Sequence, residues 1–164
     1  MHYLSNGGIG TRTKIFIAVV IIVVIIALSI WGLTQVKFET PTLVASNLSL
    51  NPNEITTTGS AALSFTLKNN DEAKAHSVKA VFNTTSLVTF YQNNVSLSVG
   101  DNGLQYLPIT LQSSQESTYP LKVTATLTGG ASTSTYSIRI DFYDENSARF
   151  DTKTVSLKVN QETA

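Results

Sequence analysis

The sequence predicts an all-β domain, built as an antiparallel two-sheet sandwich and preceded by one N-terminal transmembrane helix. Three observations support this prediction. Residues 15–33 contain no charged side chain and consist mainly of isoleucine, valine, alanine and leucine. After residue 42, apolar and polar side chains alternate in short runs, and clusters of asparagine, aspartate, glycine and proline separate these runs.

The uncharged run 15–33 has the length of a membrane anchor. As a helix it spans roughly 28 Å at about 1.5 Å per residue, close to the hydrocarbon thickness of a bilayer. Arg12 and Lys14 precede the run, and Trp31 lies near its far end, where an indole ring suits the lipid interface. Because positive charge marks the cytoplasmic side, the chain is expected to divide into a cytoplasmic tail 1–14, a transmembrane helix 15–33, a stalk 34–42, a β-sandwich ectodomain 43–160 and a tail 161–164.

A cleaved signal peptide is the alternative interpretation of the same run. Ala27-Leu28-Ser29 resembles a cleavage site with two small residues. The apolar run is longer than the roughly 7–15 residues of a signal-peptide core, and it continues through Ile30 and Leu33. Retention is therefore favoured, and we expect a single-pass protein of the cell membrane with the sandwich outside the cell.

The alternation is clearest in residues 136–142, where every second side chain is apolar. Residues 63–67, 123–127 and 155–159 follow the same pattern, and turns such as Asp101-Asn102-Gly103 lie between such runs. No segment beyond the stalk has helical periodicity. Many short strands without an internal repeat predict an immunoglobulin-like architecture, although without the disulfide of antibody domains because the chain has no cysteine.

The composition argues against several functional classes. The formal net charge is zero, so no concentrated positive charge points to nucleic acid. Without cysteine there is no thiolate nucleophile and no cysteine-ligated metal. His76 is the one histidine outside the predicted cytoplasmic tail, and a lone histidine beside Lys74 and Lys79 is expected to be a surface residue. We expect no catalytic residue, no cofactor and no enzyme activity.

One acidic cluster could in principle bind calcium. Asp141, Asp144, Glu145 and Asp151 surround one predicted hairpin, but their spacing does not match the EF-hand loop. Strand alternation also directs Asp141 outward, on the same face as Arg139. A solvated, charged hairpin is the favoured interpretation, and no metal site is expected.

Three sequons agree with an extracellular domain. Asn47, Asn83 and Asn94 each begin an Asn-x-Ser/Thr sequence and are candidate glycosylation sites.

Two stretches are more apolar than a solvated strand requires, and they are candidates for a partner or dimer interface. Leu87, Val88, Phe90 and Tyr91 belong to the first, and Leu107, Pro108 and Ile109 to the second. Proline is tolerated mainly on edge strands, and an apolar edge strand invites pairing with another copy. The alternative is that both stretches lie centrally in a sheet and are covered by loops.

The whole layout resembles the crenarchaeal archaellum accessory proteins of the FlaF (ArlF) family. The resemblance rests on the short N-terminal tail, the isoleucine-rich helix 15–33 and the cysteine-free sandwich rich in asparagine, serine and threonine. It implies a stator component of the archaeal motility structure. Such a protein would face the S-layer from the pseudoperiplasm, bind the S-layer protein, and act with a FlaG-like relative and the archaellum motor. The two apolar stretches, and not the resemblance, lead us to expect that the ectodomain forms homodimers.

Other interpretations remain open. The same residues suit a non-catalytic accessory subunit of another archaeal membrane complex. An adhesin or pilus subunit is disfavoured because no processing site separates Arg12 and Lys14 from the apolar run. An enzyme or a cupredoxin-like electron carrier is disfavoured by the missing cysteine and the near absence of histidine.

Overall fold

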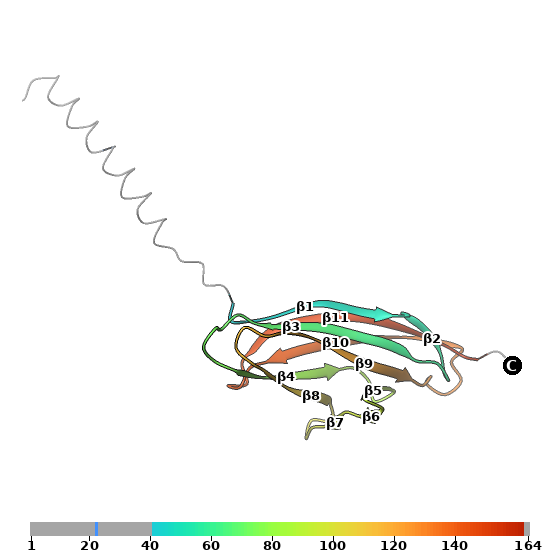
Figure 1. The fold of residues 1–164 in the computed structure, drawn as a ribbon. Coiled ribbons are helices and arrows are strands. Elements are labelled where there is room, and N and C mark those ends of the chain that lie inside the picture. Colours follow the sequence, from blue (N-terminus) through green and yellow to red (C-terminus); the bar gives the residue numbers. More distant parts are fainter. Residues whose placement is uncertain (1–21, 23–40, 163–164) are drawn as a thin grey trace, which may run out of the picture. The chain divides into compact units, whose positions relative to one another are not determined.

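The computed structural model describes Ile22 and residues 41–162 of the 164-residue chain. Residues 41–162 form two β-sheets that pack on each other (Figure 1). In chain order the strands are β1 Leu43–Asn51, β2 Glu54–Thr56, β3 Ala61–Asn69, β4 His76–Asn83, β5 Val88–Gln92, β6 Val95–Ser96, β7 Ser98–Val99, β8 Gln105–Leu111, β9 Glu116–Ala125, β10 Thr133–Tyr143 and β11 Arg149–Asn160.

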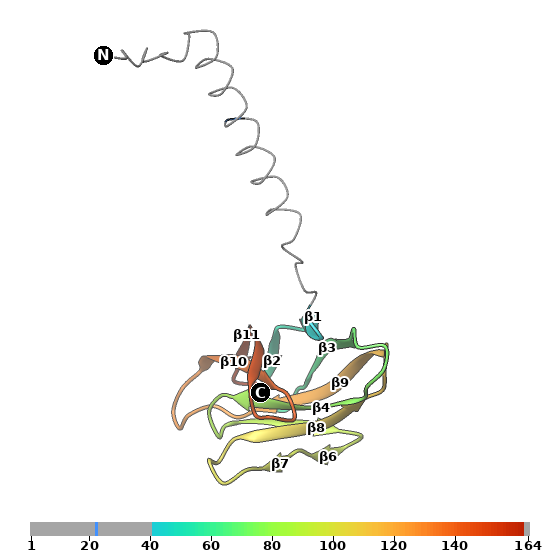
Figure 2. The same cartoon turned by 90° about the vertical axis from the view of Figure 1, so that its left-hand side faces the viewer.

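The first sheet has the strand order β1-β3-β9-β5-β6, and the second has the order β2-β11-β10-β4-β8-β7. Figure 2 shows β4, β8 and β7 side by side in the second sheet. Among the described residues the strand pairs are antiparallel, except that β2 runs parallel to β11 with Glu54 opposite Lys158. The prediction of an all-β fold with antiparallel sheets is confirmed. The sequence does not predict the parallel pair, because the three residues of β2 are too few to show alternation.

The core lies between the sheets and is aromatic at its centre. Phe65 of β3 and Phe90 of β5 come from the first sheet, and Phe82 of β4 and Phe142 of β10 come from the second; each is at most 1% exposed. The ring centroids of Phe65 and Phe142 lie 5.2 Å apart, and those of Phe82 and Phe90 lie 4.5 Å apart, so both contacts join the two sheets.

All buried residues of this core lie between Leu43 and Val159. Residues 40–164 therefore contain the described hydrophobic core, and we expect this fragment to fold without the preceding segment.

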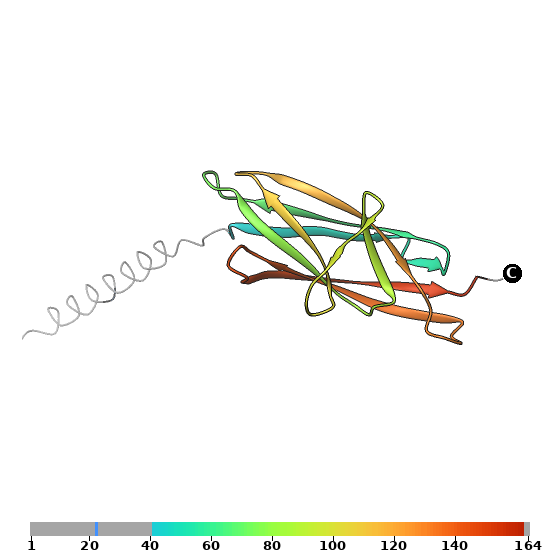
Figure 3. The same cartoon turned by 90° about the horizontal axis from the view of Figure 1, so that it is seen from below.

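The chain passes from one sheet to the other at residues 95–99. β6 pairs with β5 in the first sheet, and β7 pairs with β8 in the second. Leu97, between them, is buried and donates its backbone N–H to the carbonyl of Phe90 at 2.9 Å. Figure 3 views the sandwich from below and shows this segment, in yellow-green, nearest the viewer. Because β7 pairs only with Gln105 and Tyr106, residues 107–111 of β8 have a described strand neighbour only on the β4 side.

The predicted membrane anchor falls largely outside the described residues. Of the predicted transmembrane helix 15–33 the structure describes Ile22 alone, and Arg12, Lys14, Trp31 and the predicted tail 1–14 lie outside the described residues. Within the described part of the chain, no helix is long and apolar enough to cross a bilayer. The anchor stays a prediction from the sequence.

The aromatic contacts predict a large effect for Phe65→Ala in the fragment 40–164. Truncation removes a fully buried ring that contacts Phe82, Tyr119 and Phe142, so the free energy of unfolding should fall by about 3–5 kcal/mol. Urea denaturation measures this loss, with the near-ultraviolet circular dichroism of tyrosine and phenylalanine as the signal, because the fragment contains no tryptophan. Phe150→Ala is the control, because Phe150 is only partly buried and its truncation should lower the free energy of unfolding much less. An equal decrease in both variants would contradict the central role of Phe65.

Candidate functional site

The structure corrects most of the interface predicted from the two apolar stretches. Val88, Phe90, Leu107 and Ile109 are at most 6% exposed and belong to the core, so they cannot form a binding surface. The reason is strand alternation: these positions of β5 and β8 point inward between the sheets. Of the other predicted residues, Leu87 and Tyr91 are half-buried, and Pro108 is exposed.

An exposed apolar surface does lie nearby, and its two most exposed side chains, Val95 and Val99, are not among the residues predicted from the sequence. Val95 is 68% exposed and Val99 is 61% exposed, and both are on the short strands of the sheet crossing. Together with Tyr106 and Pro108, Val95 lines a hollow of about 210 Å³ beside the unpaired part of β8. We call Tyr91, Val95, Val99, Tyr106 and Pro108 the apolar edge. The sequence gives little signal for it, because Val95 lies between Asn94 and Ser96 and Val99 between Ser98 and Gly100, outside any longer apolar run.

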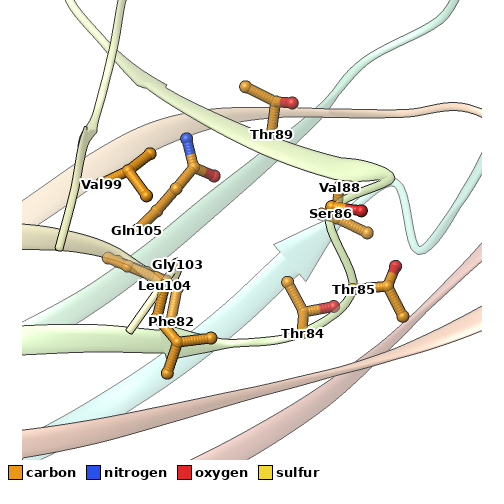
Figure 4. Close-up of a pocket in the computed structure, with 10 residues that line it drawn as sticks. All are labelled: Phe82, Thr84, Thr85, Ser86, Val88, Thr89, Val99, Gly103, Leu104 and Gln105. Carbon is orange, nitrogen blue, oxygen red and sulfur yellow. The ribbon is translucent and has the colours of Figure 1, made fainter. Parts of the chain in front are cut away.

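A second hollow, of about 310 Å³, opens where β4 and β5 meet the start of β8 (Figure 4). The polar residues Thr84, Thr85, Ser86, Thr89 and Gln105 line it together with apolar residues such as Phe82 and Val88. None of its lining residues is charged, so no hydroxyl there has a neighbouring base that could activate it as a nucleophile.

Gln105 of the second sheet makes a hydrogen bond to the first sheet beside this hollow. Its Oε1 accepts the backbone N–H of Phe90 at 3.1 Å. The Oγ1 of Thr84 is buried, and it has no hydrogen-bond partner within the described part of the chain.

His76 has a more specific environment than the sequence predicts. Its Nε2 lies 3.1 Å from Asp71 Oδ2, and its Nδ1 lies 3.0 Å from Glu145 Oε1. Lys74 Nζ reaches the same Oε1 at 2.8 Å. The imidazole is only 11% exposed, and it joins the β3–β4 loop to the β10–β11 hairpin. We call Asp71, Lys74, His76 and Glu145 the histidine cluster.

The cluster shifts the pKa values of its members in the directions expected for an imidazolium between carboxylates. The hydrogen bond to Asp71, together with that to Glu145, raises the pKa of His76 against the opposing effect of burial. The hydrogen bond from Lys74, with that from His76, lowers the pKa of Glu145 to about 2. Backbone N–H donation from Ala73, followed by the His76 contact, lowers the pKa of Asp71.

These shifts predict how stability depends on pH. The contribution of His76 to the free energy of unfolding is complete below its ordinary pKa of 6.5 and disappears as the pH rises through the raised pKa. The contribution of Glu145 has the opposite dependence: it is complete above 4.5 and disappears as the pH falls toward about 2. The free energy that His76→Gln removes should therefore be larger at about pH 5.5 than at about pH 9. Urea titrations at both values measure it, with Glu72→Gln as the control in the same loop; an equal loss at both values would show that no proton is involved.

The asparagines of the three sequons differ in exposure and in hydrogen bonding. Asn47 and Asn94 are exposed, on the β1 irregularity and at the β5–β6 turn. Asn83 instead donates from Nδ2 to Asp141 Oδ2 at 2.6 Å and is partly buried. The nitrogen to which a glycan would be attached is thus engaged at Asn83 in the folded domain.

The acidic hairpin residues do not come together as ligands. Asp141 lies on the outer face beside Arg139, with 3.2 Å between the carboxylate and the guanidinium, although its neighbours cover it. Within residues 41–162, no group of three or more ligand-type side chains is arranged to hold a metal ion.

No protein-family model matches the sequence, and no curated protein matches it significantly. Some solved structures are similar in part. A Pseudomonas fluorescens alkylpurine DNA glycosylase, AlkC, bound to DNA is 12% identical over 73% of this chain and 30% of its own, with a TM-score of 0.44. A mutant Salmonella alpha-2-macroglobulin is 11% identical over 74% of this chain and 7% of its own length, with a TM-score of 0.45. The CARDB domain of a Pyrococcus furiosus protein in complex with two metal ions is 16% identical over 76% of this chain and 96% of its own length, with a TM-score of 0.44.

The chain thus spans less than a third of the length of the first two proteins. With these identities and TM-scores, none of the three likenesses carries an argument about the function of this protein.

Proposed function

We propose that this chain is a membrane-anchored stator component of the archaeal motility structure, of the FlaF (ArlF) kind. Helix 15–33 would hold it in the cell membrane, and the sandwich would bind the S-layer protein from the pseudoperiplasm. Torque would then turn the filament and not the motor housing. A FlaG-like relative and the motor itself would be further partners.

The apolar edge is the observation that best supports a binding role. Exposed valines beside a strand with an unpaired side are typical of surfaces that meet another protein. The sandwich also has a complete core of its own, as a load-bearing domain requires. We infer further that its architecture is immunoglobulin-like, for which two sheets around one shared core are the support.

The alternative is a non-catalytic accessory subunit of another archaeal membrane complex. It would use the same anchor and the same apolar edge with a different partner. Proteins that co-purify with the full chain after extraction in a mild detergent distinguish the two: motor components support the stator, and subunits of a transporter or oxidase support the alternative.

Self-association through the apolar edge is testable with substitutions that leave the core intact. In sedimentation velocity at high concentration, the wild-type fragment 40–164 should form dimers, and Val95→Lys with Val99→Lys should give monomers because like charges would face each other across the contact. Thr135→Lys, an exposed position on β10, is the control and should leave the dimer intact. A monomeric wild-type fragment would contradict this use of the edge.

Binding to the S-layer is tested by co-sedimentation of the fragment 40–164 with isolated S-layer sheets. Saturable pelleting, absent with an unrelated sandwich domain, is the expected result. A fragment that stays in the supernatant across pH and salt would contradict the stator proposal and favour the accessory subunit.

A further inference from the structure

The outer face of the second sheet carries a hollow of about 350 Å³ that the proposed function does not use. Its base is formed by β4 and β10, where Asn83 lies opposite Arg139, Val81 opposite Asp141, and Lys79 opposite Tyr143. These are the outward positions of both strands, because their neighbours along the chain are buried in the core. Arg149 of β11 also lines the hollow.

Asp141 is a buried carboxylate at the base of this hollow. It is 2% exposed, although it is on the solvent side of the sheet. Thr152 Oγ1 donates to its Oδ1 at 2.7 Å, and Asn83 Nδ2 donates to its Oδ2 at 2.6 Å. Arg139 Nη2 lies 3.2 Å from Oδ2, and Arg149 Nη1 lies 3.6 Å from Oδ1. Both carboxylate oxygens are thus surrounded by donors.

The two guanidinium groups keep much of their surface free. Arg139 is 51% exposed and Arg149 is 55% exposed. Each guanidinium has several N–H donors arranged in a planar fork, and the contact with Asp141 involves one nitrogen of each. Asp141 therefore lies within ion-pair distance of both forks, and about half of each arginine side chain is exposed to solvent.

The lining of the hollow has an excess of positive charge. Its cations are Lys79, Arg139 and Arg149, and its carboxylates are Asp141 and Asp144. Asp144 is occupied locally, since its Oδ1 accepts backbone N–H groups within the β10–β11 hairpin. Lys79 makes no ion pair with a carboxylate among the described residues, and its Nζ lies 4.5 Å from the centre of the Tyr106 ring.

The side chains around these cations are of the kinds enriched in protein interfaces. Tyr143 lines the hollow, and Tyr106 lies beneath the Lys79 ammonium and continues into the apolar edge. Val81 provides a buried apolar floor. Tyrosine and arginine around an apolar floor are typical of interface hot spots, and arginine forks match carboxylates in a bidentate manner.

We propose that this hollow is a docking site for an acidic segment of a partner protein, with Arg139 and Arg149 as the residues that pair with its carboxylates and Asp141 as the residue that positions them. The identity of the partner rests on the proposed function, in which the sandwich binds the S-layer protein. The chemistry of the site stands on the geometry alone. Binding should weaken as salt is added, because part of the pairing is exposed to solvent.

The direct experiment is NMR titration of the ¹⁵N-labelled fragment 40–164 with a Glu-Gly repeat peptide, and with a Gln-Gly repeat peptide as the neutral probe. The acidic peptide should shift the amides around Arg139 and Arg149, and Arg139→Gln with Arg149→Gln should weaken its binding about tenfold. Lys68→Gln with Lys122→Gln removes the same charge from exposed positions of the first sheet and should leave the affinity unchanged.

Removing both arginines leaves Asp141 buried without its cations, so that variant is paired with one that also carries Asp141→Asn. The triple variant contains no buried charge at this site, so it should fold and bind the acidic peptide as weakly as the double variant. Equal affinity of either folded variant and wild type would overturn the proposal. So would equal binding of the acidic and neutral peptides.

Co-sedimentation with S-layer sheets distinguishes a failure of the docking site from a failure of the stator proposal. If the wild-type fragment pellets and the folded arginine variants pellet equally, the docking site is wrong while the stator proposal stands. If the wild type does not pellet but binds the acidic peptide through its arginines, the stator proposal fails and the acidic docking site stands for another partner. Loss of pelleting in the arginine variants alone supports both.

Discussion

Contact between aromatic rings of opposite sheets is the interaction on which the rest of this domain depends. The chain has no cysteine, so no disulfide joins the sheets as in antibody domains. Phe65 meets Phe142, and Phe82 meets Phe90, each pair with one ring from either sheet and with no ring more than 1% exposed. Burial of apolar surface must therefore supply most of the stabilisation, and the neighbouring strands alternate inward and outward around these rings.

Packing of the two sheets also determines where the surface can be functional. Inward positions of β5 and β8 are needed for the core, which leaves the sheet crossing and the outward positions to face other molecules. At the crossing, β6 and β7 are too short to cover the neighbouring strand along its length. The apolar edge follows from this geometry: Val95 and Val99 have no inward position to occupy.

Charged side chains are few, and those at two places are grouped with specific partners. In the histidine cluster, the β3–β4 loop and the β10–β11 hairpin meet on one imidazole at the same end of the second sheet. At Asp141, three strands of the second sheet supply donors to one carboxylate. Residues far apart in sequence form both groups, such as His76 with Glu145 and Asn83 with Asp141. The order of strands in the second sheet, where β4 lies beside β10, is what brings them together.

The sequence by itself determined the all-β class, the alternating runs that became β3, β9, β10 and β11, and the outward direction of Asp141 beside Arg139, because each of these is a local property of side-chain period. Only the tertiary structure decided which apolar residues are buried, that β2 runs parallel to β11, and that His76 lies between two carboxylates. Those outcomes depend on which strands become neighbours, and neighbours across a sheet leave no periodic trace along a single chain.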